Sequence, residues 1–167
     1  MTETIEYRQA SEADYPQLHK LNVAALPHVN DIDVDTFKRL HGTAISLEVA
    51  VQGMQIAGFL LAMDQNADYE SLNFQWFHAR YPQFAYVDRI IVAEQFRRRS
   101  IAESLYQRLI ARLSDATPVL TCEVNLSPPN PGSIAFHQRL GFAGVDEQST
   151  EGGNKRVLLM ARSLSAD

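Results

Sequence analysis

The chain begins with alternating apolar and polar side chains and then changes to a helical spacing. Residues 4–9 alternate like a short strand, and the polar segment from Ser11 to Asp14 has the pattern of a capped helix start. Apolar residues then recur at helical spacing, and the helix is expected to end at Pro27. A second short helix is predicted from Asp35 to about His41, with Gly42 as its stop.

Two apolar runs in the middle of the chain predict a β-hairpin. Residues 44–51 and 55–63 are rich in aliphatic side chains, and Gln52-Gly53 between them is a turn signal. The stretch that follows, residues 64–83, has no clear period. It is rich in aromatic residues, namely Tyr69, Phe74, Trp76, Phe77 and Tyr81. Loops of this length are uncommon in compact domains and tend to be functional, so we interpret the stretch as a functional loop.

The second half of the chain alternates strands with helices. Strands are expected over residues 84–92, 118–124 and 154–162, helices over 100–113 and 132–139, and one or two weak strands near 142–150. The order β-α-α-β-β-β-α-β-α-β combines antiparallel hairpins with one β-α-β crossover. We therefore predict an α/β fold, a mixed sheet with helices on both faces. A ligand is expected near the carboxyl ends of its central strands.

Composition narrows the class of protein. The chain has 167 residues, 46% of them hydrophobic, which suits one domain over residues 1–167. Its formal net charge is −5, so a nucleic-acid partner is not expected. No apolar run reaches membrane-spanning length, the N-terminal segment is polar, and Cys122 is the single cysteine. These features predict a cytoplasmic protein with no membrane partner. The histidines lack metal-ligand spacing, so no metal is expected.

The most informative stretch is residues 87–109, a strand that passes through a basic loop into an amphipathic helix. Such a turn directs backbone N–H groups and the positive end of the helix dipole at one place, which makes an anion site. Arg97, Arg98 and Arg99 add fixed charge and forked donors suited to phosphate. A pyrophosphate is the most natural ligand for this arrangement.

The same stretch resembles motif A of the GNAT superfamily of acetyltransferases. In that family a loop of the form Gln/Arg-x-x-Gly-x-Gly/Ala cradles the pyrophosphate of acetyl-CoA. The matching positions here are Arg97, Ser100 and Ala102, so serine stands in place of the first glycine. Glycine allows closer backbone approach, so the loop is expected to bind coenzyme A more weakly. Downstream, CEVNLSPPNPGSIAFHQRLGF resembles motif B, with His137 where the family often has tyrosine.

The resemblance implies a GNAT-type fold and an N-acetyltransferase that uses acetyl-CoA as co-substrate. The backbone of residues 90–92 would pair with the pantetheine arm, and the N–H of Val92 is the candidate oxyanion donor. The residues expected to bind the cofactor are Ile90, Ile91, Val92, Arg97, Arg98, Arg99, Ser100, Ile101, Ala102, Asn130, Ser133, Phe136 and His137.

Two residues are candidates for proton transfer. An amine with a pKa of about 10 is protonated near pH 7 and needs a base before it can attack the thioester. Glu123 is the first candidate, because its Cys-Glu-Val-Asn context resembles the segment that supplies the base in ribosomal-protein N-terminal acetyltransferases. The alternatives are an ordinary strand glutamate and Asp88 as the base. His137 either protonates the departing thiolate or only lines the pocket.

The acceptor is expected to meet two loops. Val29 and Asn30 follow the first helix, and Trp76 and Phe77 belong to the aromatic stretch, where packing against the sheet or a partner is the alternative. A small-molecule amine or amino acid is the favoured acceptor. The histidine at position 137 also resembles the phosphinothricin and methionine sulfoximine branch of the family. A protein or peptide acceptor and a catalytically weak acyl-CoA-binding regulatory module are the alternatives. A homodimer stays open, because dimers are common in the family.

Overall fold

The structure is a computed structural model that describes residues 4–164. Its strands are β1 (Glu6–Gln9), β2 (Ser46–Gln52), β3 (Gln55–Asp64), β4 (Ala85–Val92), β5 (Val119–Ser127), β6 (Ala143–Thr150) and β7 (Lys155–Ser163). Its α-helices are α1 (Tyr15–Ala24), α2 (Val34–Thr43), α3 (Leu72–His78), α4 (Ile101–Arg112) and α5 (Pro131–Arg139). Short 3-10 turns cover Glu12–Asp14, Glu94–Phe96 and Glu151–Gly153.

The strands form a mixed sheet in the order β1-β2-β3-β4-β5-β7-β6, which confirms the predicted α/β fold. The chain divides into two compact units, which are described separately. The first unit comprises residues up to 62 and residues 89–112, and the second comprises residues 63–88 and those from 113 onward. The prediction of one domain over the whole chain stays a prediction.

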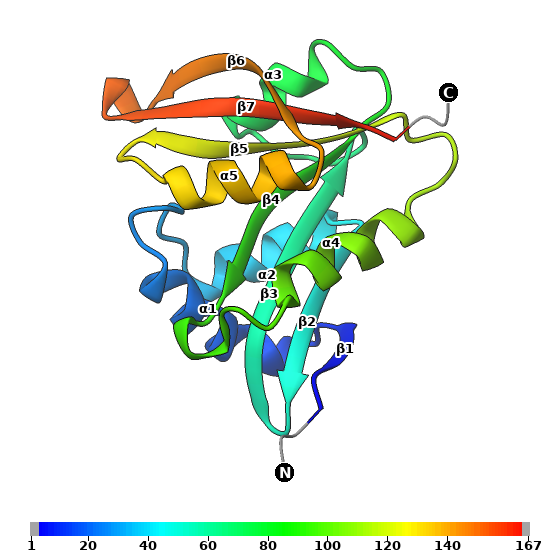
Figure 1. Cartoon of the computed structure of the whole chain (residues 1–167), viewed down its shortest axis with the longest axis vertical. Helices are drawn as coiled ribbons and strands as arrows, with labels where there is room; N and C mark the ends of the chain where they lie inside the picture. The colour runs from blue at the N-terminus through cyan, green and yellow to red at the C-terminus, as the bar shows by residue number, and fades with distance from the viewer. Residues whose placement is uncertain (1–3, 165–167) are drawn as a thin grey trace. The chain divides into compact units, whose positions relative to one another are not determined.

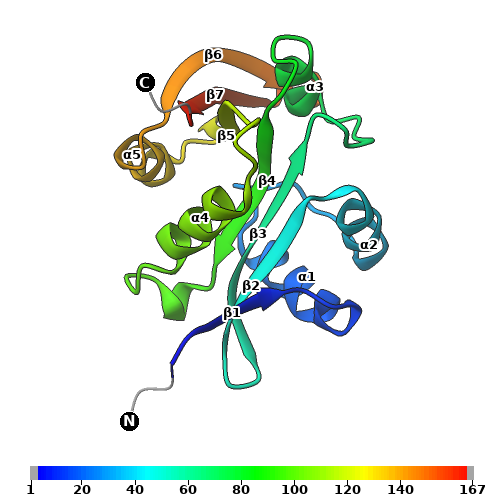
Figure 2. The ribbon, with the colours of Figure 1, turned by 90° about the vertical axis from the view of Figure 1, so that its right-hand side faces the viewer.

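In the first unit an antiparallel sheet is covered by helices on two sides. β1 pairs with β2, and β2 pairs with β3 in the predicted hairpin, which turns at Gly53 with a φ of 60°. Figure 2 shows α1 and α2 on one side of these strands and α4 on the other. The core on the α1 and α2 side includes Leu18, Phe37 and Phe59, each fully buried.

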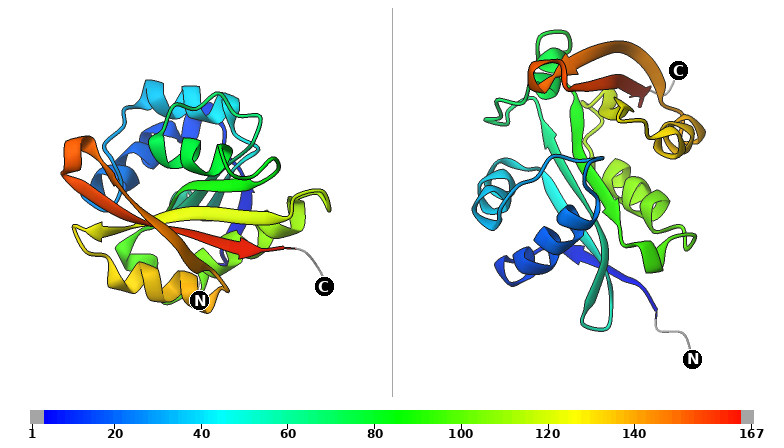
Figure 3. Two further views of the ribbon diagram at one scale, coloured as in Figure 1. Left: turned by 90° about the horizontal axis from the view of Figure 1, so that it is seen from above. Right: turned by 90° about the vertical axis from the view of Figure 1, so that its left-hand side faces the viewer.

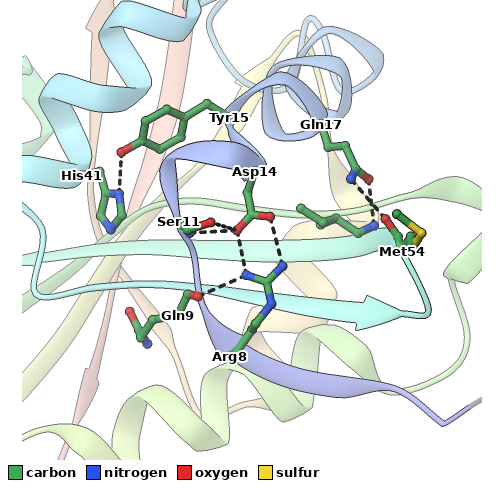
Figure 4. A network of polar contacts seen from close by, with 9 residues as sticks. Arg8, Gln9, Ser11, Asp14, Tyr15, Gln17, His41 and Met54 are labelled. Atoms are coloured by element: carbon green, nitrogen blue, oxygen red, sulfur yellow. Dashed lines mark hydrogen bonds and ion pairs between the residues drawn. The ribbon is translucent and has the colours of Figure 1, made fainter.

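The short 3-10 turn that leads into α1 is held by the capping residues that the sequence predicts. Asp14 accepts a hydrogen bond from the backbone N–H of Ser11 at 2.8 Å, and Arg8 grips both carboxylate oxygens at 2.7 and 3.0 Å (Figure 4). Hydrogen bonding from Arg8 is the main reason why the pKa of Asp14 is lowered. At the next residue, the Tyr15 hydroxyl lies 2.7 Å from Nδ1 of His41 and so connects α1 to α2.

The predicted stop of α2 at Gly42 is wrong. The helix continues through Gly42 to Thr43 and ends where Ala44 turns to an extended conformation. A Cβ at Gly42 would meet nothing within 4 Å, so nothing around this glycine requires its small size. The start of the helix is defined by Asp33, whose carboxylate accepts the N–H of Thr36 at 2.8 Å.

In the second unit a parallel pair of strands continues into an antiparallel sheet. β4 runs parallel to β5 through Ala85↔Leu120 and Tyr86↔Thr121, which confirms the predicted β-α-β crossover. β5 pairs antiparallel with β7, and β7 with β6, which is the weak strand expected near residues 142–150 (Figure 1). Figure 3 shows α3 and α5 on opposite faces of these strands.

The aromatic stretch is not the continuous loop that was predicted, because α3 forms inside it. Ser71 caps this helix by accepting the N–H of Phe74 at 3.4 Å. Phe74 and Phe77, three residues apart, turn one face of the helix into the core, where both are fully buried. Two turns are too short for a helical period to stand out in the sequence. None of the helices within residues 4–164 is long and apolar enough to cross a membrane.

Candidate active site

The basic loop before α4 bends through two residues in the left-handed region. Arg98 has a φ of 65° and Ser100 a φ of 60°, values that residues other than glycine seldom adopt. Turns of this kind gather successive backbone N–H groups into a concave anion-binding surface. The first-turn N–H groups of α4, which follow directly, have no acceptor within the helix. Arg97, Arg98 and Arg99 are exposed, so the loop fits the pyrophosphate predicted for it.

The strand before this loop is held close to β3 at a glycine. A Cβ on Gly58 would stand 2.7 Å from the carbonyl oxygen of Ile91 and 3.2 Å from Cα of Val92. One residue on, the N–H of Ala93 donates to the carbonyl of Ala57 at 2.8 Å. The backbone of Ile91 and Val92, predicted to meet the pantetheine arm, is therefore fixed from the β3 side. Ile90 and Val92 are half-buried and Ile91 is buried.

The loop between α1 and α2 (the α1–α2 loop, residues 25–33) carries Val29 and Asn30, which were expected to contact the acceptor. Val29 is half-buried. The side-chain oxygen of Asn30 accepts a 2.7 Å hydrogen bond from Nη2 of Arg89, and its carbonyl accepts a 3.3 Å bond from Nη1. Both oxygens of Asn30 thus accept hydrogen bonds from the guanidinium of Arg89.

Glu123 lies on β5 and forms a hydrogen bond with a buried tyrosine of β4. The hydroxyl of Tyr86 donates to Oε2 of Glu123 at 2.6 Å. The pKa of Tyr86 is raised well above 10, first by burial and then by the charges of Glu123 and Asp88. Tyr86 therefore stays a hydroxyl donor at neutral pH. Glu123 is only half-buried, so its side chain is partly accessible to solvent.

A second carboxylate of this unit has a matching arrangement. Asp88 accepts a 2.5 Å hydrogen bond from the hydroxyl of Tyr69. Asp88 and Glu123 each lie two residues beyond the last β4–β5 pair, Tyr86↔Thr121, at the carboxyl end of the parallel ladder. This is the end at which ligands bind to open parallel sheets.

The sequence did not single out Tyr86 as a site residue, and it singled out Tyr69 only as one aromatic residue of a loop. The only local signal for Tyr86 is its position two residues before Asp88 in a strand, where alternate side chains share a face.

His137 is buried on α5, and its ring has a defined hydrogen bond. Nδ1 lies 2.7 Å from the carbonyl oxygen of Ser133, so Nδ1 carries the proton and Nε2 has the lone pair of a neutral ring. Burial lowers the pKa of His137 below 6.5, and the Ser133 hydrogen bond opposes part of that shift. Phe136 and Phe142 meet the ring edge-to-face, with centroids 5.2 and 5.4 Å away.

The other motif B residues lie at the start of α5. Asn130 is the residue before the helix, its N–H donates to the carbonyl of Asn125 at 3.2 Å, and Pro131 occupies the first helical position. Ser133 and Phe136 are half-buried. The cofactor contacts predicted for motif B therefore lie on one short helix after β5 and at its N-cap.

The two aromatic candidates of α3 have different surroundings. Phe77 packs in a cluster of aromatic rings with Phe84 and Tyr86, which is the packing alternative that the sequence left open. Trp76 is half-buried, and the Arg80 guanidinium lies over its ring at 3.8 Å. Across the described part of the chain, no three His, Cys, Asp or Glu side chains are grouped so that they could hold a metal ion.

The predicted site residues fall in both compact units. Residues 90–92 and 97–102 belong to the first unit, and Glu123, Asn130, Ser133, Phe136 and His137 to the second. Within each unit, motif residues that are close in sequence lie on the same strand, loop or helix.

Comparisons with known proteins identify the family. A family model described as "Acetyltransferase (GNAT) family" matches residues 9–142. Among curated proteins, none matches this chain by sequence.

Solved structures share the fold at low sequence identity. The ribosomal-protein-S18-alanine N-acetyltransferase from Escherichia coli is 19% identical, covers 98% of this chain and 96% of its own, and has a TM-score of 0.72. Arabidopsis thaliana NAA60 in complex with a bisubstrate analogue is 20% identical, with 96% and 98% covered and a TM-score of 0.75. The ribosomal-protein-alanine N-acetyltransferase from Brucella melitensis is 20% identical, with 95% and 99% covered and a TM-score of 0.69.

Proposed function

Because the chain belongs to the GNAT family of acetyltransferases, we propose that it acetylates the α-amino group of a protein or peptide N-terminus. Acetyl-CoA as the acetyl donor follows from the family. The acceptor is our proposal, and it replaces the small amine favoured by the sequence. It is supported by two fold neighbours whose names describe N-acetyltransferases of ribosomal-protein alanine.

The observation that carries the proposal is the pair of tyrosine–carboxylate hydrogen bonds. Glu123 with Tyr86 and Asp88 with Tyr69 place two acidic groups at the carboxyl end of the parallel ladder. Negative charge there attracts a cationic amine. An α-amino group has a pKa of about 8 and a lysine amine about 10.4, so a carboxylate base deprotonates the α-amino group more readily.

In this mechanism Glu123 is the general base, directly or through one water molecule. The Tyr86 hydroxyl orients the Glu123 carboxylate, which accepts a proton from the attacking amine. Acetyl-CoA supplies the thioester, whose carbon–sulfur bond breaks as the carbon–nitrogen bond forms. We propose that the N–H of Val92 stabilises the oxyanion and that Arg97 to Ala102 hold the pyrophosphate.

His137 is proposed to line the cofactor pocket as a neutral ring. Its Nδ1–H is directed at the Ser133 carbonyl, so a proton could leave only from Nε2 of the charged ring. Since burial lowers its pKa, the charged form is the minor one near pH 7. These contacts favour pocket lining over protonation of the thiolate, the other role that the sequence left open.

The test is an acceptor panel with acetyl-CoA, read by the release of free thiol. Peptides with free N-termini and varied first residues are compared with the same peptides blocked at the N-terminus, free amino acids and alkyl amines. We expect turnover of the free peptides, and none of the blocked ones even when they contain lysine. Turnover confined to free amino acids or alkyl amines would instead support the small-amine acceptor. Stabilisation by acetyl-CoA without any turnover would support the acyl-CoA-binding module.

A further inference from the structure

Arg89 is a buried cation at the centre of a small hydrogen-bond network in the first unit. Its side chain bonds Asn22 of α1 at 2.7 Å and both oxygens of Asn30 at 2.7 and 3.3 Å. The network is closed by Asn22, whose Nδ2 donates to the carbonyl of Asn30 at 3.0 Å. Asn22 is 0% and Arg89 5% exposed, so the bond between these two side chains is shielded from water.

The network joins the α1–α2 loop to β4. At its start the loop makes backbone bonds from Leu26 to Val23 and from His28 to Ala25. Asn30, in its middle, is the residue that the guanidinium holds, and Arg89 directly precedes the strand segment Ile90 to Val92. A displacement of Arg89 or of Asn30 would therefore release the middle of the loop from the strand.

We propose that Arg89 is a positioning residue that fixes the α1–α2 loop and thereby sets the affinity for the acceptor amine. The inference rests on the proposed function in one respect, namely that this loop contacts the acceptor. Arginine suits the role because its planar fork bonds several acceptors at once, whereas lysine is a point charge on a flexible stem. Hydrogen bonds to a charged group are also stronger than those between neutral groups.

The first measurement needs no acceptor. Hydrogen exchange followed by mass spectrometry compares the wild type with Arg89→Lys and Asn30→Ala, and residues 25–33 should exchange several-fold faster in both variants. Arg108→Lys is the matched control, since Arg108 lies in the same unit and bonds the buried Glu48 at 2.9 Å. That control should leave exchange of residues 25–33 unchanged. Asn30 is exposed, so Asn30→Ala tests the idea even if Arg89→Lys folds poorly.

The second measurement is steady-state kinetics with whichever amine the wild type acetylates. Both variants should raise the acceptor KM roughly tenfold, the effect of one lost charge-assisted hydrogen bond, and leave the KM for acetyl-CoA nearly unchanged. In Asn30→Asp, which gives Arg89 a charged partner, residues 25–33 should exchange no faster than in the wild type. In the double variant Arg89→Lys/Asn30→Ala the two effects should not add, because both remove the same contact.

Two results would overturn the proposal. One is unchanged exchange of residues 25–33 in both variants. The other is faster exchange with an unchanged acceptor KM, which would make the network purely structural. Neither result depends on which amine is the substrate. A failure of the proposed function would appear separately, as wild-type turnover of amines other than peptide N-termini.

Discussion

The buried hydroxyl of Tyr86 donates a 2.6 Å hydrogen bond to Oε2 of Glu123. Tyr86 is on β4 and Glu123 on β5, and the two strands are parallel neighbours at this point. The bond holds one carboxylate oxygen in place, and the raised pKa of Tyr86 keeps the donor protonated in any ordinary assay buffer. Glu123 therefore has a defined orientation, as a positioned general base requires.

Replacing Glu123 with glutamine should abolish most of the activity without affecting cofactor binding. Glutamine can still accept the Tyr86 hydrogen bond but cannot take a proton, so we expect kcat to fall about 100-fold or more. The shift in Tm caused by acetyl-CoA should match that of the wild type. Tyr86→Phe, which removes only the hydrogen bond, should lower kcat less. Full activity of Glu123→Gln would transfer the base role to Asp88, and Asp88→Asn would be the next variant.

Ser100→Gly should relieve backbone strain in the basic loop before α4. The φ of 60° costs an L side chain about 1 kcal/mol and costs glycine almost nothing, although glycine loses more entropy on folding. We therefore expect a change in the free energy of unfolding within about 1 kcal/mol and a lower Kd for acetyl-CoA, measured by denaturation and calorimetry. The matched control is Ser104→Gly inside α4, which should destabilise the protein by about 0.5 kcal/mol and leave the Kd alone. A higher Kd in Ser100→Gly would mean that the serine hydroxyl itself binds the cofactor.

The titration of His137 should appear in the pH dependence of stability. Its pKa is lowered by folding, so its contribution to the free energy of unfolding is complete above about pH 6.5 and is lost as pH falls toward the folded-state pKa. Urea denaturation of the wild type and of His137→Gln should therefore diverge as pH falls below about 6.5, with the wild type losing stability faster. If the ring only lines the pocket, wild-type kcat will not decline as pH rises from about 6 to 8. A decline in that range, absent from His137→Gln, would establish His137 as the acid.

The carboxylate of Asp14 should make the first unit sensitive to acid. Arg8 and the Ser11 N–H lower its pKa, so its stabilising effect is present above about pH 4 and is lost as pH falls through the folded-state pKa. Asp14→Asn should cost about 1 kcal/mol at pH 7, because Asp14 is buried but Arg8 is half-exposed. The difference from the wild type should shrink in acid, as measured by denaturation at several pH values. A difference independent of pH would show that shape rather than charge matters at this position.

Elements marked by local signals could be predicted from the sequence. The Ser11 to Asp14 cap, the Gly53 turn and the strand–loop–helix around Arg97 to Arg99 are each defined by neighbouring residues. Such signals depend on hydrogen bonds and sterics within a few residues, so one sequence is enough to show them. α3 lacked a signal of this kind, because its two buried phenylalanines are equally consistent with a loop that packs on a sheet.

Contacts between distant segments could not be predicted in the same way. Tyr86 and Glu123 are 37 residues apart, and Arg89 and Asn30 are 59 apart. Which residues meet across such distances depends on the order of the strands in the sheet and on how the helices and loops pack against it. Motif similarity drew attention to Glu123 and His137, but it contained no information on what holds either side chain.

Gly58 makes the proposed oxyanion donor accessible to experiment. That donor is a backbone amide, which only proline at position 92 would remove, and proline would also restrict the backbone of the strand. An added methyl group at Gly58 would press on the Ile91 carbonyl and on Val92, and would displace the amide while leaving every proposed catalytic side chain as it is. Gly58→Ala thus separates the part of the rate that comes from backbone geometry from the part that comes from acid–base chemistry.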